Sequence, residues 1–127
     1  MTRSMLMVVL ARFAGAETAG GETWYSKAAE WAIANGISDG SRPSENITRE
    51  QLVTMLWRYM GSPAAADTLS GYADANTISN YAREAMNWAV KNGLVNGFGD
   101  GRLGPQGQAT RAQVAEIIKN LITNLMQ

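Results

Sequence analysis

The chain has 127 residues, a length that suits one ordinary domain, and its 46% hydrophobic content is normal for a globular protein. Lys and Arg total 11 and Asp and Glu total 11, so no basic excess indicates a nucleic-acid partner. Because the chain has no cysteine and no histidine, disulfides, thiolate catalysis, histidine-dependent catalysis and most zinc sites are excluded. We therefore expect a binding or structural module that is not an enzyme and uses no metal or cofactor.

The first sixteen residues have two interpretations. An early Arg3, an apolar run over residues 5–11 and a small-residue ending resemble a short signal peptide, although Arg12 interrupts the run. The stretch is too short and too charged to span a membrane. The alternative, an amphipathic helix that ends at Gly15, is favoured because the same pattern returns twice further along the chain.

Three segments begin with the dipeptide Thr-Arg, at Thr2, Thr48 and Thr110. In each, apolar residues follow at the spacing i, i+3, i+4, i+7 and i+8, which predicts one buried stripe of an α-helix. Gln51 and Gln113 stand three residues after the second and third threonines, so both helices should begin with a capping box. The first helix has methionine at that position and should have only half of this cap.

A second type of helix is predicted twice, starting at Trp24 and at Tyr81. Both copies are alanine-rich, carry a tryptophan expected in the core (Trp31 or Trp88) and end in Asn-Gly followed by an aliphatic residue. Glycine allows the left-handed backbone at a helix end, and the aliphatic residue packs back on the last turn.

The order of these elements gives a helix–loop–helix repeat. We expect an all-α fold and a single domain over residues 1–127, built from a partial repeat at 2–15 and complete repeats at 23–61 and 72–123. A lone two-helix unit buries little surface, so the repeats should pack with their Thr-Arg helices around a common axis.

The repeated arginines Arg3, Arg49 and Arg111 lie in the first turn of their helices. A cation there is disfavoured by about 0.3–1 kcal/mol, so each arginine should have an anionic partner. That partner is either an anionic ligand group or the carboxylate of a neighbouring repeat, and the two are compatible. Trp24, next to a glycine-rich linker, is a candidate platform for stacking on a sugar ring.

The most glycine-rich loop spans residues 96–105. It lacks the Gly-Lys-Ser/Thr of a phosphate-binding loop and the ligand spacing of an EF-hand, and a helix rather than a strand precedes it. Its pattern indicates a turn.

Taken together, three motifs resemble the S-layer homology repeat of bacterial surface proteins. They are Trp-Ala-x-x-Asn-Gly-aliphatic, Gly-x-x-Asp-Gly-x-aliphatic-x-Pro, and Thr-Arg-Ala-Gln followed by an apolar helix. Residues 72–122 carry the whole pattern, opening with an aromatic-x-Asp motif that ends at Asp74. Residues 24–61 carry a second copy, and residues 2–15 carry the end of a first.

The resemblance implies a pseudo-threefold bundle of helical repeats outside the cell, at the bacterial wall or S-layer. It implies that the module anchors an exported protein to an acidic secondary cell-wall polysaccharide bearing ketal-linked pyruvate, without inserting into a membrane. The ligand would lie in grooves between adjacent repeats. The residues that it assigns to ligand binding are Arg3, Arg49, Arg111, Asp74, Trp24 and Gly101.

The second repeat departs from the family pattern. It lacks the aromatic-x-Asp opening, and its loop at residues 39–43 is shorter than that of the third repeat, so one groove is expected to be degenerate. The alternative function is a protein-interaction or self-assembly module that has lost glycan binding. Since the first repeat lacks its first helix, either the natural protein continues upstream and this chain is a fragment of it, or a second copy supplies the missing contact. In the second case a homodimer is predicted.

Overall fold

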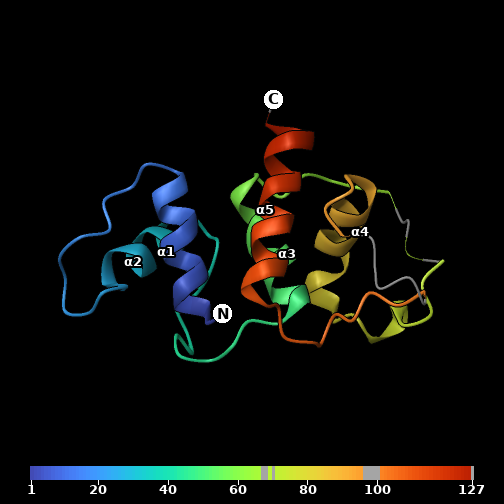
Figure 1. Ribbon diagram of the computed structural model, residues 1–127, viewed down its shortest axis with the longest axis horizontal. Coiled ribbons are helices and arrows are strands. Elements are labelled where there is room, and N and C mark those ends of the chain that lie inside the picture. Colours follow the sequence, from blue (N-terminus) through green and yellow to red (C-terminus); the bar gives the residue numbers. More distant parts are fainter. Residues whose placement is uncertain (67–68, 70, 96–100, 127) are drawn as a thin grey trace. The chain divides into compact units, whose positions relative to one another are not determined.

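The computed structural model describes residues 1–66, 69, 71–95 and 101–126. Within these residues all regular secondary structure is helical and no strand occurs, which confirms the predicted all-α class (Figure 1). The contacts divide the chain into two compact units, Met1–Ile47 and Thr48–Gln127.

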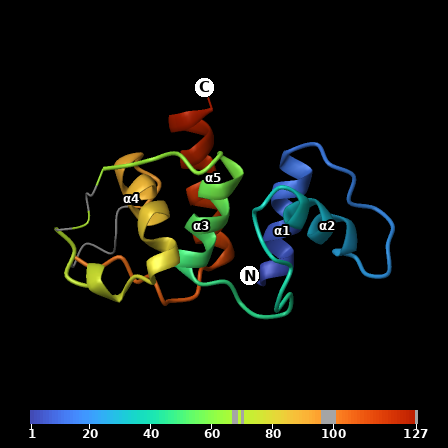
Figure 2. The same ribbon diagram turned by 180° about the vertical axis from the view of Figure 1, so that it is seen from behind.

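The first unit consists of two helices that pack together, α1 (Arg3–Phe13) and α2 (Ser26–Ala34) (Figures 1 and 2). Thr2 caps α1: its Oγ1 accepts a hydrogen bond from the Met5 N–H at 3.2 Å. Because position 5 is methionine, no side chain returns a bond, and the half-formed cap is confirmed. The N-terminal segment is therefore a helix, as its apolar stripe predicts.

The elements of the second unit are α3 (Arg49–Tyr59), the 3₁₀ turns η1 (Ala75–Thr77) and η2 (Asn80–Ala82), α4 (Arg83–Lys91) and α5 (Arg111–Leu125). Among them, α3 packs against α4. Both predicted capping boxes are present, joining Thr48 to Gln51 at the start of α3 and Thr110 to Gln113 at the start of α5.

The predicted Asn-Gly ends of α2 and α4 are confirmed. Gly36 and Gly93 have φ angles of 68° and 71°, the left-handed region that glycine enters without a steric penalty. The following Ile37 and Leu94 donate their N–H groups back to the helix at 2.9 Å and are almost completely buried. Each helix end is thus closed by hydrogen bonds and by an apolar contact.

The predicted starts of these two helices are wrong by two residues, because α2 begins at Ser26 and α4 at Arg83. Neither helix has a side-chain cap at its start, which is the signal that marks the first turn in a sequence. Trp24 and Tyr81 therefore precede the helices, with 60% and 49% of their surface exposed.

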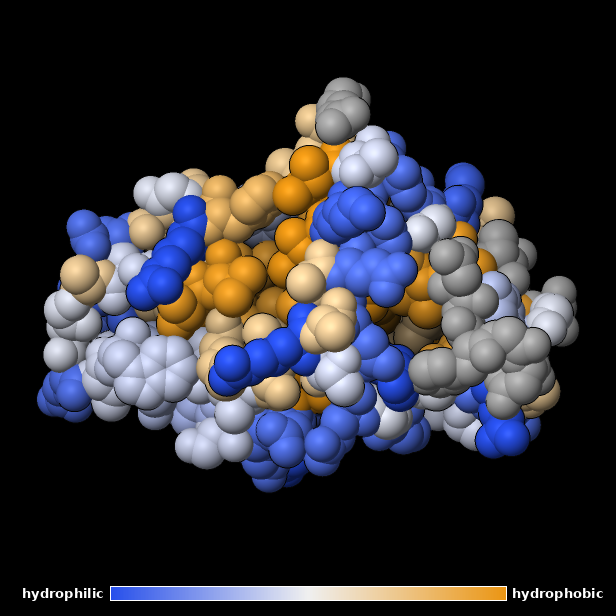
Figure 3. All heavy atoms as spheres, in the orientation of Figure 1, coloured by the Kyte–Doolittle hydropathy of each residue, from blue (hydrophilic) through white to orange (hydrophobic). Residues whose placement is uncertain are grey.

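The two helices of this type are buried to different degrees. Trp88 lies in the core as predicted, but Trp31 is only half-buried. In α4 five successive residues, 85–89, are buried, whereas α2 buries only Ala28 and Ala32. The prediction for Trp31 was wrong because α2 is covered on one narrow face. Figure 3 shows that hydrophobic residues reach one face of the molecule among hydrophilic ones.

Candidate ligand-binding site

In the second unit, the start of α3 is docked on the proline loop of the following repeat. The Arg49 N–H donates to the Gly107 carbonyl at 2.9 Å, and the Glu50 N–H donates to the Pro105 carbonyl at 3.0 Å. The first N–H groups of a helix have no partner inside the helix. This loop supplies two of them with acceptors, and so it fixes the end of the helix that carries Arg49.

The Arg49 side chain lies against the same loop. Its Nη1 donates to the Gly104 carbonyl at 3.2 Å. Burial lowers the pKa of Arg49 from its ordinary value, although arginine keeps its charge in proteins. The guanidinium occupies the space into which a Cβ atom at Gly107 would project. The structure thus places a partly buried cation at the junction of two repeats.

Asp74 also binds this loop, through hydrogen bonds to its backbone. Its two carboxylate oxygens accept hydrogen bonds from the N–H groups of Leu103 and Gly104, at 2.8 and 2.9 Å. Burial acts to raise the pKa of Asp74, but these two donors outweigh burial and hold the pKa below its ordinary value of 3.8. The Gly101 carbonyl also accepts from the Ala73 N–H at 2.7 Å. Asp74, Gly101 and Arg49 therefore meet on one loop.

Glu50 is a member of this site that the sequence analysis missed. Its side chain is 2% exposed, and its Oε1 accepts from the Ser79 N–H at 3.2 Å and from Gln106 Nε2 at 2.8 Å. A buried carboxyl group needs such partners, because burial without them is costly. The sequence did carry a signal for Glu50. The matching positions of the other two Thr-Arg helices hold the small residues Ser4 and Ala112, so a glutamate stands out there.

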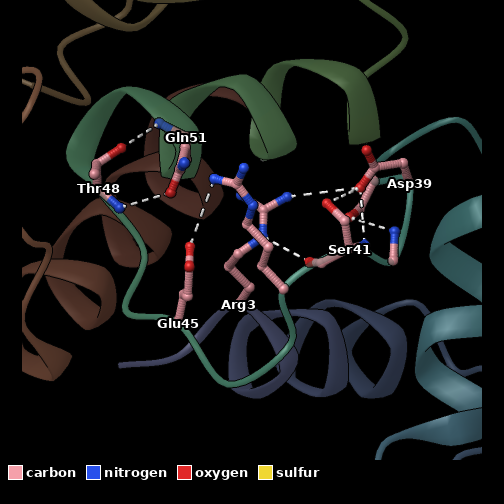
Figure 4. Close-up of polar contacts among 9 residues, drawn as sticks. Arg3, Asp39, Ser41, Glu45, Thr48 and Gln51 are labelled. Atoms are coloured by element: carbon pink, nitrogen blue, oxygen red, sulfur yellow. Dashed lines mark hydrogen bonds and ion pairs between the residues drawn. The ribbon is translucent and has the colours of Figure 1, made fainter.

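In the first unit, the start of α1 is docked on a loop in the same way, but the arginine side chain has different partners. The Arg3 N–H donates to the Glu45 carbonyl at 2.9 Å. Its side chain turns to the short loop, where Nε donates to the Ser41 carbonyl at 3.1 Å and Nη2 lies 3.8 Å from the Asp39 carboxylate (Figure 4). The Ser41 hydroxyl and N–H hold the pKa of Asp39 below its ordinary value. Here the carboxylate partner expected for a Thr-Arg arginine comes from the protein itself.

The remaining predicted site residues lie apart from these contacts. Arg111 is exposed at the start of α5, and its side chain makes no hydrogen bond or ion pair with any described residue. Trp24 packs edge-to-face on Tyr25, with ring centroids 5.2 Å apart. Within the described ranges, no hydrogen bond or ion pair connects either residue to Asp74. The first part of the glycine-rich loop, residues 96–100, lies outside the described residues.

In the part of the chain that the structure describes, no three acidic side chains gather closely enough to hold a metal ion. No helix among those residues has the length and apolar character needed to cross a membrane.

Comparison with known proteins identifies one domain family, since residues 71–115 match the S-layer homology domain. The amylopullulanase of Thermoanaerobacterium thermosulfurigenes is 37% identical over 110 residues, a match that covers 78% of this chain and 6% of that enzyme. The surface-layer 125 kDa protein of Lysinibacillus sphaericus is 29% identical over 112 residues, covering 82% of this chain and 9% of that protein.

Among solved structures, an undecaheme cytochrome from the S-layer of Carboxydothermus ferrireducens resembles the chain in fold. The TM-score is 0.53 at 23% identity, and the match covers 92% of this chain and 20% of the cytochrome. At this level of identity the similarity supports the helical fold alone.

The chain spans less than a tenth of either relative named above, so the enzyme name of one belongs to a much larger protein. S-layer homology domains are non-catalytic modules that generally anchor surface proteins to cell-wall polymers. With the surface-layer relative, the match confirms the predicted location outside the cell, at the cell wall. The motif pattern, the helical fold and the match agree, and residues 71–115 carry an S-layer homology domain, as the motifs predict.

Proposed function

We propose that this chain is a non-catalytic module that anchors an exported protein to an acidic secondary cell-wall polysaccharide bearing ketal-linked pyruvate. The family supports binding to cell-wall polymers in general. The observation that carries the finer proposal is the Arg49 guanidinium, held at the start of α3 against a loop that Asp74 fastens. A pyruvate ketal presents a carboxylate, the group that a guanidinium binds best.

The helix start contributes to this site through its charge. The N–H groups of Arg49 and Glu50 already donate to the loop, so they are not free to bind an anion. The partial positive charge at the start of α3 still favours a carboxylate nearby, and the guanidinium supplies the direct contact. Trp24 is proposed as a separate platform, because its exposed ring can stack on the apolar face of a sugar.

Calorimetric titration tests this function. The chain is titrated with a short pyruvylated cell-wall saccharide and with the same saccharide after mild acid has removed the pyruvate. We expect binding to the pyruvylated form alone and its loss in Arg49→Ala. The exposed Arg12→Ala, at the far end of a Thr-Arg helix, is the matched control and should bind as the wild type does. Absence of binding to either saccharide would contradict the proposal.

The pairing of Arg3 with Asp39 supports a second candidate function, a protein-interaction or self-assembly module. In the first unit a Thr-Arg arginine takes a protein carboxylate as its neighbour, at 3.8 Å. Arginines of this kind could equally take a carboxylate from a partner protein or from a second copy of the chain. Sedimentation equilibrium distinguishes self-assembly, because a homodimer is expected at micromolar concentration and a monomer would contradict it.

A further inference from the structure

The two docked helix starts have the same backbone geometry. The caps Thr2 and Thr48 have φ and ψ angles of −86° and 164° and of −85° and 164°. In both units the N–H of the arginine donates to a loop carbonyl at 2.9 Å, and the N–H of the next residue donates to the carbonyl of the loop proline. The different contacts of the two arginine side chains therefore do not come from the backbone at the helix start.

The matching loop position, two residues after the proline, differs between the units. It is Glu45 in the first and Gly107 in the second, and its carbonyl is the acceptor for the arginine N–H in both. At Gly107, the space that a Cβ would take is occupied by Arg49 Nη1, which reaches the Gly104 carbonyl. Arg3, beside a residue with a full side chain, reaches the Ser41 carbonyl instead.

The backbone does not explain a glycine at position 107. Gly107 has no φ angle in the left-handed region, so alanine would fit its conformation without strain. The atoms that a new Cβ would meet most closely belong to the movable end of Arg49. The glycine therefore provides space for the guanidinium.

We propose that Gly107 is a specificity-determining residue of the acidic-saccharide site. By leaving this space it holds the Arg49 guanidinium against the loop at the start of α3, and the saccharide carboxylate binds there and not at Arg3. The Arg3 guanidinium, next to Glu45, turns instead to the Ser41 carbonyl and the Asp39 carboxylate of the short loop. This inference rests on the proposed function and adds which of these two arginines binds and why.

Calorimetry on a matched pair of variants tests the inference, with the pyruvylated saccharide as probe. Gly107→Ala should weaken binding by about tenfold, as expected for one misplaced charge-assisted hydrogen bond, and leave the thermal midpoint unchanged. Glu45→Ala, at the matching position of the other unit, should bind as the wild type does. Arg3→Ala should also bind normally. Wild-type affinity in Gly107→Ala, or loss of binding in Arg3→Ala, would overturn the inference.

A measurement without ligand separates this inference from the proposed function. In ¹⁵N NMR spectra at low temperature, the Arg49 guanidinium should show separate Nη signals, because its bond to the Gly104 carbonyl slows rotation. Gly107→Ala should merge them, and unchanged signals would overturn the role of Gly107. If the wild type fails to bind the saccharide, the proposed function and the choice between Arg49 and Arg3 both fail, and the NMR comparison still decides whether Gly107 positions Arg49.

Discussion

Asp74 links the opening of the third repeat to a loop 29 residues further along the chain. The family resemblance assigns this aspartate to ligand binding, and both of its carboxylate oxygens have backbone donors within 2.9 Å. Those donors precede Pro105, and the carbonyl of one of them, Gly104, accepts from Arg49. Asp74 therefore acts on Arg49 through the loop, as a positioning residue.

Asp74→Asn should lower the stability of the fold by about 1 kcal/mol at pH 7, because an amide oxygen replaces two charged acceptors. The pKa of Asp74 is lowered in the folded state, so its stabilisation is present above the ordinary pKa of 3.8 and is lost as pH falls through the folded pKa. The difference in thermal midpoint between wild type and variant should therefore vanish in that acidic range.

Asp39→Asn is the matched control for this experiment. Asp39 also has a lowered pKa, but its hydrogen bonds reach only Ser41, two residues away, and its side chain is 75% exposed. We expect a midpoint shift much smaller than that of Asp74→Asn. Equal shifts in the two variants, or a difference for Asp74→Asn that persists well below pH 3.8, would contradict a structural role for the Asp74 carboxylate.

At the residue scale, the sequence predicts where the arginines lie but not what they contact. Helix periodicity and the Thr-Arg dipeptide were enough to place Arg49 in a first turn. The acceptor of its guanidinium lies 55 residues away, and Glu50 pairs with a residue 56 positions away. Nothing in local spacing encodes such partners, so Glu50 and Gly107 became visible only in the folded chain.

At the element scale, helix ends were predicted correctly where their stabilising contacts are local. The capping boxes join residues three apart, and the Asn-Gly ends are closed within the last turn. The starts of α2 and α4 were misplaced because neither has a side-chain cap. Helix ends that carry a capping motif are thus readable from sequence, and helix starts without one are not.

The capping box of α3 should contribute to binding as well as to stability. Thr48→Ala removes the hydroxyl that accepts from the Gln51 N–H, at a cost of about 1 kcal/mol in the free energy of unfolding (Figure 4). Because the freed helix start carries Arg49, we also expect weaker binding of the pyruvylated saccharide. Chemical denaturation and calorimetry on the same samples measure the two effects.

Thr110→Ala removes the same cap from α5 and is the control. It should cost a similar amount of stability and leave saccharide affinity unchanged, because Arg111 has no docked loop to hold it among the described residues. If Thr110→Ala weakens binding and Thr48→Ala does not, the acidic group binds at the start of α5 instead.

At the scale of the whole molecule, the compact units do not follow the sequence repeats. The division between Ile47 and Thr48 falls inside the repeat at 23–61, just before its Thr-Arg helix. In each unit, the Thr-Arg helix of one repeat is docked on the proline loop of the next. Sequence periodicity reveals which segments are alike, but it does not reveal which of them pack together.

Because the compact units and the sequence repeats have different boundaries, we can predict which fragments of the chain fold on their own. A fragment over residues 48–127 keeps α3 together with α4 and with the loop that docks its first turn, so it should unfold cooperatively on heating. A fragment over residues 62–127 contains the whole third repeat but lacks α3. It should melt without a cooperative transition, because the buried face of α4, including Met86, loses the helix that packs against it.

Circular dichroism in the far and near ultraviolet measures both fragments. If both fragments melt with the same cooperativity, α3 is not needed for folding. The third sequence repeat, and not the compact unit Thr48–Gln127, would then be the folding unit. A cooperative transition in residues 48–127 but not in residues 62–127 would mean that the third repeat needs the Thr-Arg helix of the second repeat to form a stable unit. The loop contacts that hold Arg49 at the start of α3 would then also belong to the contacts that stabilise this unit.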